Sequence, residues 1–593
     1  MESRVQGDFT ATPAMLRLVA LAVPIGCVGA LVAVALLDLI GLITNALYHG
    51  RLGTSLSAPD GRALWGAAAL LPVAGGLVIG AMARFGSEQI RGHGIPEAME
   101  NILVRGSRVQ PRLAVLKPIS SAVSIGTGGP FGAEGPIILT GGALGSLVGQ
   151  FLTLSAAERK TLLVAGAAAG MSGVFGTPAA AVMLGVELLL FEWKPRSMVP
   201  VAVAAAVAAA VRMRLADADL IGAAPLFPVP AHGAPDERAL LSALVIGVAG
   251  GLLAWLLTAA VYGAEDLFRR LPLHWAWWPA IGGAVVGLGG LIEPRALGVG
   301  YASLHAELVG GLAIGALLSL LLVKLVVWSV ALGSGTSGGI LAPLLIMGAA
   351  LGGVVGTALP GGGPSQWALL GMTATMAGVM RSPFTSVLFA LELTRDLDAL
   401  LPLLVAATAA HAVSVLVLRR SILTEKVARR GVHVSREYAV DPLEALHAEE
   451  VMLARPIALR AGSPVADALD RLGAPDARRQ RLYPVVDDAG RLRGVVTWGD
   501  LSGADAGAPV GEVARPAVAA LADEPLRAVA DRMVAGGVGA VPVVGRRDGM
   551  LRGLLTEAAL MGARVRLLEE ERDRRVVLGA RARARAPSGA GRR

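Results

Sequence analysis

Apolar stretches of membrane-spanning length recur through about the first 420 residues, and they limit the folds open to this chain. A transmembrane helix needs roughly 20 consecutive, mostly apolar residues. Over the whole chain 54% of residues are hydrophobic and 17% are charged, which excludes a soluble protein of this length. The clearest stretches are residues 15–47, 64–82, 161–191, 240–261 and 311–332. We therefore expect an all-α polytopic membrane domain.

This apolar region repeats itself. The segment Met171-Ser-Gly-Val-Phe-Gly-Thr-Pro178 matches Met376-Ala-Gly-Val-Met-Arg-Ser-Pro383 at an offset of 205 residues. A second set of matches, between residues 136–149 and 343–356, has an offset of 207. Composition alone does not produce so many agreements. We therefore expect two related repeats, as in many secondary transporters, where the binding site lies at the interface between repeats.

Three segments interrupt the apolar stretches with glycine and proline. Such breaks leave free backbone N–H groups at a helix N-terminus, where the helix dipole attracts anions. Glycine permits close backbone approach, and proline suits the first helical turn. The segments are Gly92-His-Gly-Ile-Pro-Glu97, Gly132-Ala-Glu-Gly-Pro136 and Gly338-Gly-Ile-Leu-Ala-Pro343. Together they predict an anion site built from backbone amides.

Glu134 lies inside the second of these segments, and apolar residues follow it. A carboxylate at membrane depth is costly and is a functional candidate by default. Its repeat partner at the offset of 207 is Leu341, so the repeated scaffold does not require an acid there. We expect Glu134 to occupy the anion's place when charged; the alternative is a helix N-cap. Lys117 either balances Glu134 or extends toward the membrane surface.

These motifs, in this order and spacing, resemble the CLC family of chloride channels and proton/chloride exchangers. The resemblance implies that Glu134 is the gating glutamate and that the amides of Ile340 and Leu341 hold the anion. It also implies a homodimer with one pore per subunit and two repeats that are inverted in the membrane. The further anion-binding candidates are His93, Gly94, Ile95 and Gly135.

The chain departs from the family pattern at three positions. His93 stands where the family usually has serine, so an imidazole replaces a hydroxyl group at the anion site. Leu423 stands where a tyrosine usually closes the inner side of the site. Leu188 stands where exchangers carry an inner glutamate, and Glu187 points about 100° away from it on a helix. A voltage- or pH-sensitive channel and a proton-coupled exchanger therefore both remain open.

After about residue 440 the composition becomes that of a soluble α/β module, which also repeats. Tyr483-Pro-Val-Val486 leads to Gly494-Val-Val-Thr497, and Val541-Pro-Val-Val544 leads to Gly553-Leu-Leu-Thr556. Short strands followed by a helix fit both copies. This pattern resembles a tandem pair of CBS domains. The resemblance implies an adenine-nucleotide site at Thr497 and Asp500, whereas the second copy has Ala559 in place of the acid. A dimerisation module without a ligand is the alternative.

The expected organisation follows from these boundaries. A cytosolic segment (1–13) precedes membrane repeat 1 (14–215), a connecting loop (216–238), membrane repeat 2 (239–425), the CBS pair (445–565, with copies at about 445–505 and 508–565) and a basic tail (566–593). Within this tail, residues 571–593 hold eight arginines and two acids, so this stretch contributes +6 to the net charge of +8. We expect the tail to face anionic lipid rather than nucleic acid.

The expected location is a bacterial plasma (inner) membrane, with the N-terminus, the CBS pair and the tail in the cytosol. The expected partners are chloride or another small anion, protons, lipid and a second copy of the chain. The alternative function is a CBS-regulated cation transporter of the magnesium type, for which the repeat partners Glu187 and Glu392 offer weak support. We expect the protein not to be an enzyme and to bind no metal. Its sequence shows no Walker A segment, no His/Cys cluster with the spacing of metal ligands and no lipase-type serine motif.

Overall fold

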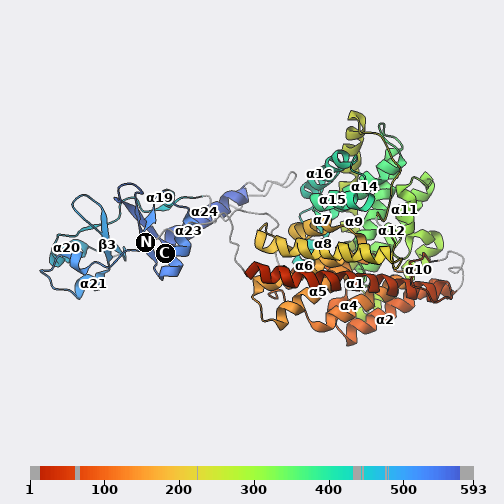
Figure 1. Cartoon of the computed structure of the whole chain (residues 1–593), viewed down its shortest axis with the longest axis horizontal. Coiled ribbons are helices and arrows are strands. Elements are labelled where there is room, and N and C mark those ends of the chain that lie inside the picture. The colour runs from red at the N-terminus through yellow and green to blue at the C-terminus, as the bar shows by residue number, and fades with distance from the viewer. Residues whose placement is uncertain are drawn as a thin grey trace, which may run out of the picture. The chain divides into compact units, whose positions relative to one another are not determined.

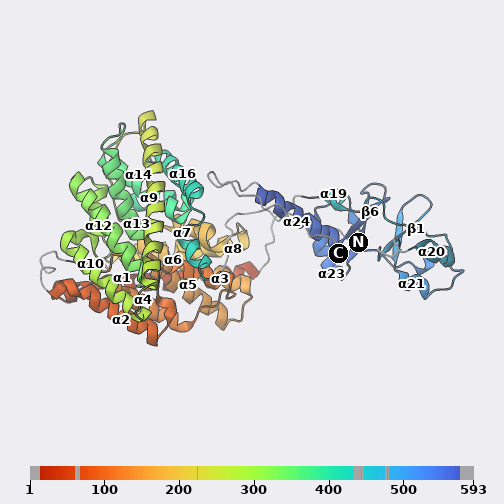
Figure 2. The same ribbon diagram turned by 180° about the vertical axis from the view of Figure 1, so that it is seen from behind.

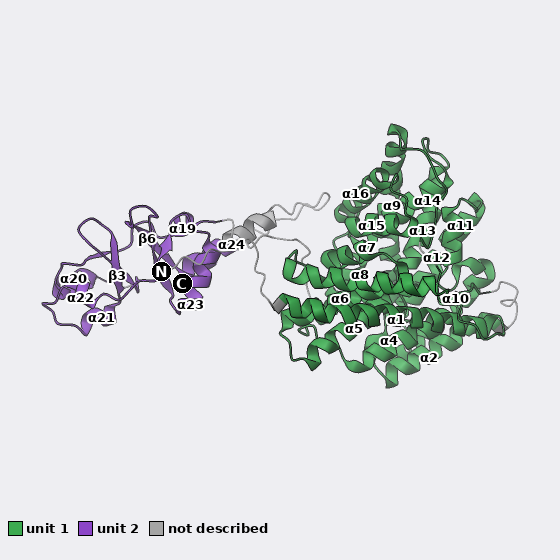
Figure 3. Ribbon diagram, in the orientation of Figure 1, with its two compact units in different colours: residues 1–436 green, residues 437–593 purple. Residues whose placement is uncertain are grey.

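The computed structural model of the chain divides into two compact units, residues 1–436 and 437–593 (Figure 3). It describes residues 14–59, 67–222, 225–431, 443, 446–474, 477 and 480–573. The predicted N-terminal segment and residues 574–593 of the predicted tail therefore lie outside the described residues. Each unit is considered separately below.

The first unit is helical throughout its described part (Figure 1). Its first half holds α1 (Ala14–Tyr48), α2 (Leu71–Phe85), α3 (Ile95–Leu103), α4 (Pro111–Gly126), α5 (Glu134–Phe151), α6 (Ala156–Phe175), α7 (Pro178–Leu184), which continues as the π-helix Gly185–Leu190, and α8 (Pro195–Asp217). Its second half holds α9 (Glu237–Arg269), α10 (Trp278–Ile292), α11 (Tyr301–Leu308), α12 (Ile314–Gly333), α13 (Leu341–Gly356), α14 (Pro364–Met380), α15 (Pro383–Thr394), α16 (Leu400–Val417) and α17 (Ile422–Ala428).

The two halves pack in the same way. Helices α1, α6 and α8 contact one another in the first half, and α9, α14 and α16 do so in the second (Figures 1 and 2). Small residues bring these backbones together: a Cβ on Gly173 would lie 2.7 Å from the Cα of Ala30, and one on Gly247 would lie 2.6 Å from the carbonyl oxygen of Ala406. Membrane helices associate through close packing of this kind, because burying apolar surface gains little in a solvent of lipid tails that is itself apolar.

Helix lengths fit a membrane domain with broken helices. Among the described residues, seven helices are long and apolar enough to cross a membrane. Three further apolar helices are too short to cross alone: α7 with its π-helical extension, α13 and α15. The prediction of an all-α polytopic domain with broken helices is confirmed.

The described residues of the second unit form two three-stranded sheets of identical topology. One sheet has the order β1 (Leu459–Arg460), β2 (Tyr483–Val486), β3 (Leu492–Val496), and the other has β4 (Ala520–Leu521), β5 (Ala540–Val544), β6 (Leu551–Thr556). In each, the first pair is parallel, the second is antiparallel, and a register shift falls near the end of the central strand. Helices cover them: α19 (Ala448–Val451), α20 (Val465–Leu472), α21 (Trp498–Ser502), α22 (Val510–Val513), α23 (Leu526–Gly536) and α24 (Glu557–Asp573). The predicted duplicated α/β module is confirmed.

Candidate functional site

The three glycine-interrupted segments meet in the first unit. The N–H of Gly132 donates to the carbonyl oxygen of Gly339 at 3.1 Å, and the N–H of Gly339 donates to that of Gly132 at 2.8 Å. These two glycines are separated by the repeat offset of 207 residues, so matched loops of the two halves bond to each other. The first segment joins them through Gly92, whose N–H donates to the carbonyl oxygen of Thr336 at 3.2 Å.

The backbones at this meeting point leave no room for side chains. A Cβ on Gly135 would lie 1.9 Å from the carbonyl oxygen of His93, and one on Gly94 would lie 2.3 Å from that of Gly135. A Cβ on Gly339 would lie 2.8 Å from the nitrogen of Gly135. The starts of α3, α5 and α13 therefore converge, and each start brings backbone N–H groups that lack a helical partner.

The predicted anion-binding residues all lie at these helix starts. Ile95, Gly135, Ile340 and Leu341 are buried, and His93 is 3% exposed with no hydrogen-bond partner for Nδ1 among the described residues. The N–H of Gly94 is already engaged, because it donates to Glu97 Oε2 at 2.8 Å. This capping bond fixes the first turn of α3, so an anion meeting Gly94 would have to share its donor with Glu97.

Glu134 is the first residue of α5 and is fully buried. Its Oε1 accepts a hydrogen bond from the hydroxyl group of Tyr301 at 3.0 Å. Its Oε2 has no fully formed hydrogen bond among the described residues, but the carboxylate lies beside the backbone N–H groups of Glu134 and Ala342. A Cβ on Gly132 would lie 1.7 Å from Oε2. The carboxylate thus folds back over the glycine loop, toward the N-terminus of α13.

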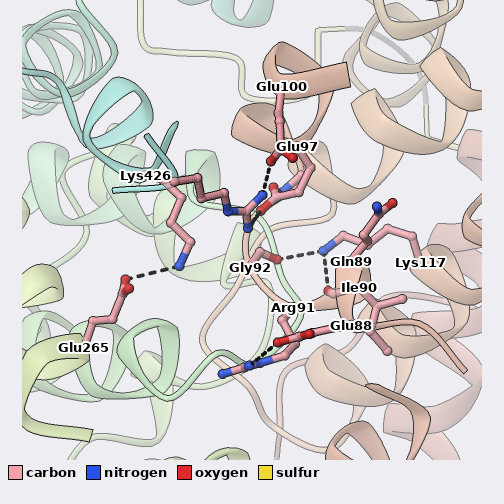
Figure 4. Close-up of polar contacts among 12 residues, drawn as sticks. Glu88, Gln89, Ile90, Arg91, Gly92, Glu97, Glu100, Lys117, Glu265 and Lys426 are labelled. Carbon is pink, nitrogen blue, oxygen red and sulfur yellow. Dashed lines mark hydrogen bonds and ion pairs between the residues drawn. The ribbon is translucent and has the colours of Figure 1, made fainter. Parts of the chain in front are cut away.

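Lys117 neither pairs with Glu134 nor extends to the surface. It is fully buried, and its Nζ donates to the carbonyl oxygens of Ile90 at 2.8 Å and Gly92 at 2.7 Å (Figure 4). The ammonium group therefore fixes the turn that leads into α3. Both predictions made from the sequence were wrong, because the carbonyl groups that the interrupted chain leaves free at Ile90 and Gly92 hold the ammonium group instead.

A cavity of about 700 Å³ opens beside the same loops. Six basic side chains and three acidic ones line it, together with Gly92, Gly335 and two tryptophans, so its charged lining is net positive. We call this space the basic cavity. Its charged lining residues are Arg91, Arg105, Arg269, Lys426, Arg429, Arg430, Glu88, Glu100 and Glu265. Because Gly92 also belongs to the first glycine segment, the cavity reaches the edge of the meeting point.

Ion pairs at this cavity join the residues just after α17 to α3, and join α17 itself to α9. Arg430 pairs with Glu97 at 3.3 Å and also with Glu100. Lys426 pairs with Glu265 of α9 at 3.1 Å (Figure 4). Helix α17 packs against α3 and carries Leu423, which is fully buried. At the position where the resemblance leads us to expect a tyrosine hydroxyl group, the helix that packs on α3 therefore carries an apolar side chain.

Glu187 and Glu392 cap each other's helices. Glu187 accepts from the N–H of Thr385 at 2.8 Å, at the start of α15, and also from the Thr385 hydroxyl group. Glu392 accepts from the N–H groups of Ala179 at 2.9 Å and Ala180 at 2.8 Å, at the start of α7. Acidic groups at helix N-termini are stabilised by unpaired N–H groups and the helix dipole. The two repeat partners are therefore architectural.

In the second unit, Thr497 and Asp500 bond to each other at the start of α21. Asp500 Oδ2 accepts from the Thr497 hydroxyl group at 2.8 Å, and Arg515 pairs with Asp500. Burial acts to raise the pKa of Asp500, but the bonds from Thr497 and the charge of Arg515 outweigh it and hold that pKa below its ordinary value. In the second copy Thr556 caps α24 through the N–H of Ala559. A nucleotide at the first copy would have to replace this cap and this ion pair.

Tyr301 is the site residue that sequence reasoning missed. It begins α11, directly after Gly298-Val-Gly300. Gly298 and Gly300 follow Gly92 and Gly94 at an offset of 206 residues, between the two offsets that define the repeat. The matching glycine pair therefore indicates a helix start at the site, but it lacks the proline that follows the glycines in the other three segments.

Comparison with known proteins agrees with this arrangement. The family model described as voltage gated chloride channel matches residues 75–415, and CBS domain models match residues 448–507 and 510–566. A relative named ClcB-like chloride channel protein, from Ralstonia nicotianae, is 29% identical over 66% of this chain and 91% of its own length. The H(+)/Cl(−) exchange transporter ClcA of Salmonella arizonae is 30% identical over 66% of this chain and 84% of its own length.

Solved structures share the fold at lower identity. A slow cyanobacterial Cl−/H+ antiporter superposes with a TM-score of 0.62 at 20% identity, over 71% of this chain and 99% of the antiporter. A eukaryotic CLC transporter superposes with a TM-score of 0.56 at 19% identity, over 92% of this chain and 98% of the transporter. From the family match over more than half of its length, we conclude that this chain is an integral membrane protein of the CLC family of anion channels and transporters and carries a C-terminal pair of CBS domains.

Proposed function

We propose that the chain moves chloride or a similar small anion across the membrane, and that Glu134 gates the path by competing for the anion's place. The observation that carries this proposal is the position of the Glu134 carboxylate, buried where the starts of α3, α5 and α13 converge. Backbone N–H groups at helix starts stabilise a nearby negative charge, whether it belongs to the carboxylate or to the transported anion. An anion and the carboxylate therefore exclude each other from the same group of donors.

The basic cavity supports the same function. Its six basic and three acidic side chains produce a positive potential next to the glycine loops. A cleft lined by one sign of charge raises the local concentration of ions of the opposite sign. Anions would therefore gather at the mouth of the amide site, where Glu134 controls further passage.

We further propose that the transport is coupled to protons, with a channel as the alternative. The Salmonella relative and the cyanobacterial structure are both named as chloride/proton exchangers or antiporters. Leu188, fully buried in the π-helical extension of α7, offers no carboxylate on the inner side. If protons do move, they reach Glu134 by another route, and a single measurement of both ions decides between the two modes.

The test is chloride efflux from liposomes that contain the purified full-length chain, with proton movement recorded alongside, for wild type and Glu134→Gln. We expect chloride to drive uphill proton movement in wild type and not in the mutant, in which chloride flux continues at an altered rate. Chloride flux without proton movement in wild type would establish the channel alternative. An absence of anion flux from both proteins would refute the proposed function.

The magnesium-type alternative has lost its support from the sequence. The carboxylates of Glu187 and Glu392 are each used to cap a helix. No group of three or more His, Cys, Asp or Glu side chains within the described ranges is arranged to hold a metal ion. A halide flux that is insensitive to added magnesium would separate the two functions.

We also propose a homodimer in a bacterial plasma membrane, with the CBS pair in the cytosol. The relatives compared above come from Ralstonia and Salmonella, which supports a bacterial source. Adenine-nucleotide binding at Thr497 and Asp500 stays a prediction. Cross-linking in native membranes and protease access from either side test the assembly and the orientation.

A further inference from the structure

Tyr301 is held at the gate by the glycine turn before it. Gly298 and Gly300 have φ angles of 63° and 79°, a region that favours glycine, and they turn the chain sharply into α11. A Cβ on Gly300 would lie 2.6 Å from the Ile346 side chain of α13. The turn is therefore packed directly against one of the helices whose start forms the anion site, which fixes where α11 begins.

The ring of Tyr301 is clamped from two sides. Phe175, at the end of α6, lies 6.1 Å from it between ring centroids, and Phe227 of the connecting loop lies 5.8 Å away, both in edge-to-face geometry. Phe175 is in turn packed against Phe389 of α15 at 4.9 Å. Such pairs favour a fixed ring orientation. The hydroxyl group of Tyr301 is thus directed at one point, and the group found there is Glu134 Oε1 at 3.0 Å.

We propose that Tyr301 is a latch that holds the Glu134 carboxylate in the anion's place. A phenol hydroxyl group bonded to a carboxylate stabilises the charged, closed arrangement, because charge-assisted hydrogen bonds are the stronger ones. An anion that enters the amide site must displace the carboxylate and break this bond. Tyr301 would then set how readily chloride competes with Glu134, without itself touching the anion. This inference rests on the proposed function.

The test uses Tyr301→Phe, which keeps the ring and its two aromatic contacts and removes only the hydroxyl group. In liposomes that contain the full-length chain, we expect the chloride concentration for half-maximal efflux to fall about tenfold, as loss of one bond to a charged group predicts. The maximal rate should rise or stay constant. Tyr48→Phe is the matched control, because it removes another buried hydroxyl group, which donates to the Thr127 carbonyl oxygen at 2.9 Å. It should leave the half-maximal concentration unchanged.

The decisive comparison places both changes in one chain. If Tyr301 acts only through the Glu134 side chain, Tyr301→Phe should change the half-maximal concentration less than twofold once Glu134→Ala, which leaves the hydroxyl group no acceptor there, is present. The same tenfold change in that background, or no change in the wild-type background, would overturn the latch. Wild type that transports chloride and responds to Glu134→Gln, but not to Tyr301→Phe, would leave the proposed function standing without the latch. Wild type that transports no anion would refute both.

Discussion

Two pairs of matched positions in the duplicated membrane unit are used in different ways. Glu187 and Glu392 are repeat partners, and each carboxylate caps a helix of the opposite half. Glu134 and Leu341 are also repeat partners, but only the first half carries an acid. The residues that both halves keep build the scaffold. The acid that one half alone carries stands at the proposed anion site.

A second unequal pair supports this distinction. Ile95 begins α3 and Tyr301 begins α11, after glycine pairs that match at an offset of 206 residues. Ile95 is an apolar, buried residue, whereas Tyr301 bonds to Glu134. The acid from one half and its hydroxyl partner from the other half therefore meet at the interface between the repeats, where transporters of this kind bind substrate.

The largest effect we expect is from an added methyl group at one of two matched glycines. In Gly339→Ala the new Cβ would meet backbone atoms, the carbonyl oxygen of Gly132 at 2.5 Å and the nitrogen of Gly135 at 2.8 Å. Since backbone cannot move aside, the variant should lose about 3 kcal/mol of stability, at the upper end for overpacking. In Gly132→Ala the new Cβ meets mainly the flexible Glu134 side chain. This variant should stay folded and transport chloride with a weakened gate.

Thermal unfolding in detergent and chloride efflux distinguish these two outcomes. Gly315→Ala in α12 is the control, because a Cβ there has nothing within 4 Å. Equal loss of stability in Gly132→Ala and Gly339→Ala would show that the matched loops are not used differently.

A smaller and symmetric effect is expected at the two capping glutamates. Glu187→Gln and Glu392→Gln each keep the side-chain shape but remove the charge from a helix N-terminus, which should cost about 1–2 kcal/mol. Both should lower the melting temperature by similar amounts and leave the half-maximal chloride concentration unchanged. A change in chloride dependence for either variant would contradict the architectural assignment.

The smallest effect is expected in the second unit, where the two copies also differ. If the first copy binds adenine nucleotide, ATP should raise the melting temperature of the full-length chain by a few degrees through preferential binding to the folded form. Asp500→Asn should abolish that rise, whereas Ala559→Ser, at the matching position of the second copy, should preserve it. A rise that persists in Asp500→Asn would place the nucleotide elsewhere.

The sequence predicted the scaffold better than the local contacts. Long apolar stretches, the two repeat offsets and the glycine breaks were enough for the helical membrane unit and for the convergence of the three segments. The engagement of Gly94 by Glu97 and the bonds from Lys117 to Ile90 and Gly92 could not be predicted. Each depends on which carbonyl or amide groups the breaks leave unpaired, and spacing does not reveal that.

Tyr301 was missed for a different reason. Its contact with Glu134 joins residues 167 apart and depends on how one repeat faces the other. The glycine pair before Tyr301 matches Gly92 and Gly94 at an offset of 206 residues, between the offsets of 205 and 207 found elsewhere in the repeat. Because no proline follows this pair, its sequence does not mark the start of α11 as a helix break at the site.

Locating the anion itself would test directly whether Glu134 and the anion share one site. Crystals of Glu134→Gln grown in bromide would show the ion by its anomalous scattering. We expect a peak in the place that the Glu134 carboxylate occupies here, beside the backbone N–H groups of Glu134 and Ala342. Wild-type crystals should show a much weaker peak there, because the carboxylate competes for these donors. Equal peaks in both proteins, or none at this place in the mutant, would contradict the claim that Glu134 and the anion share one site.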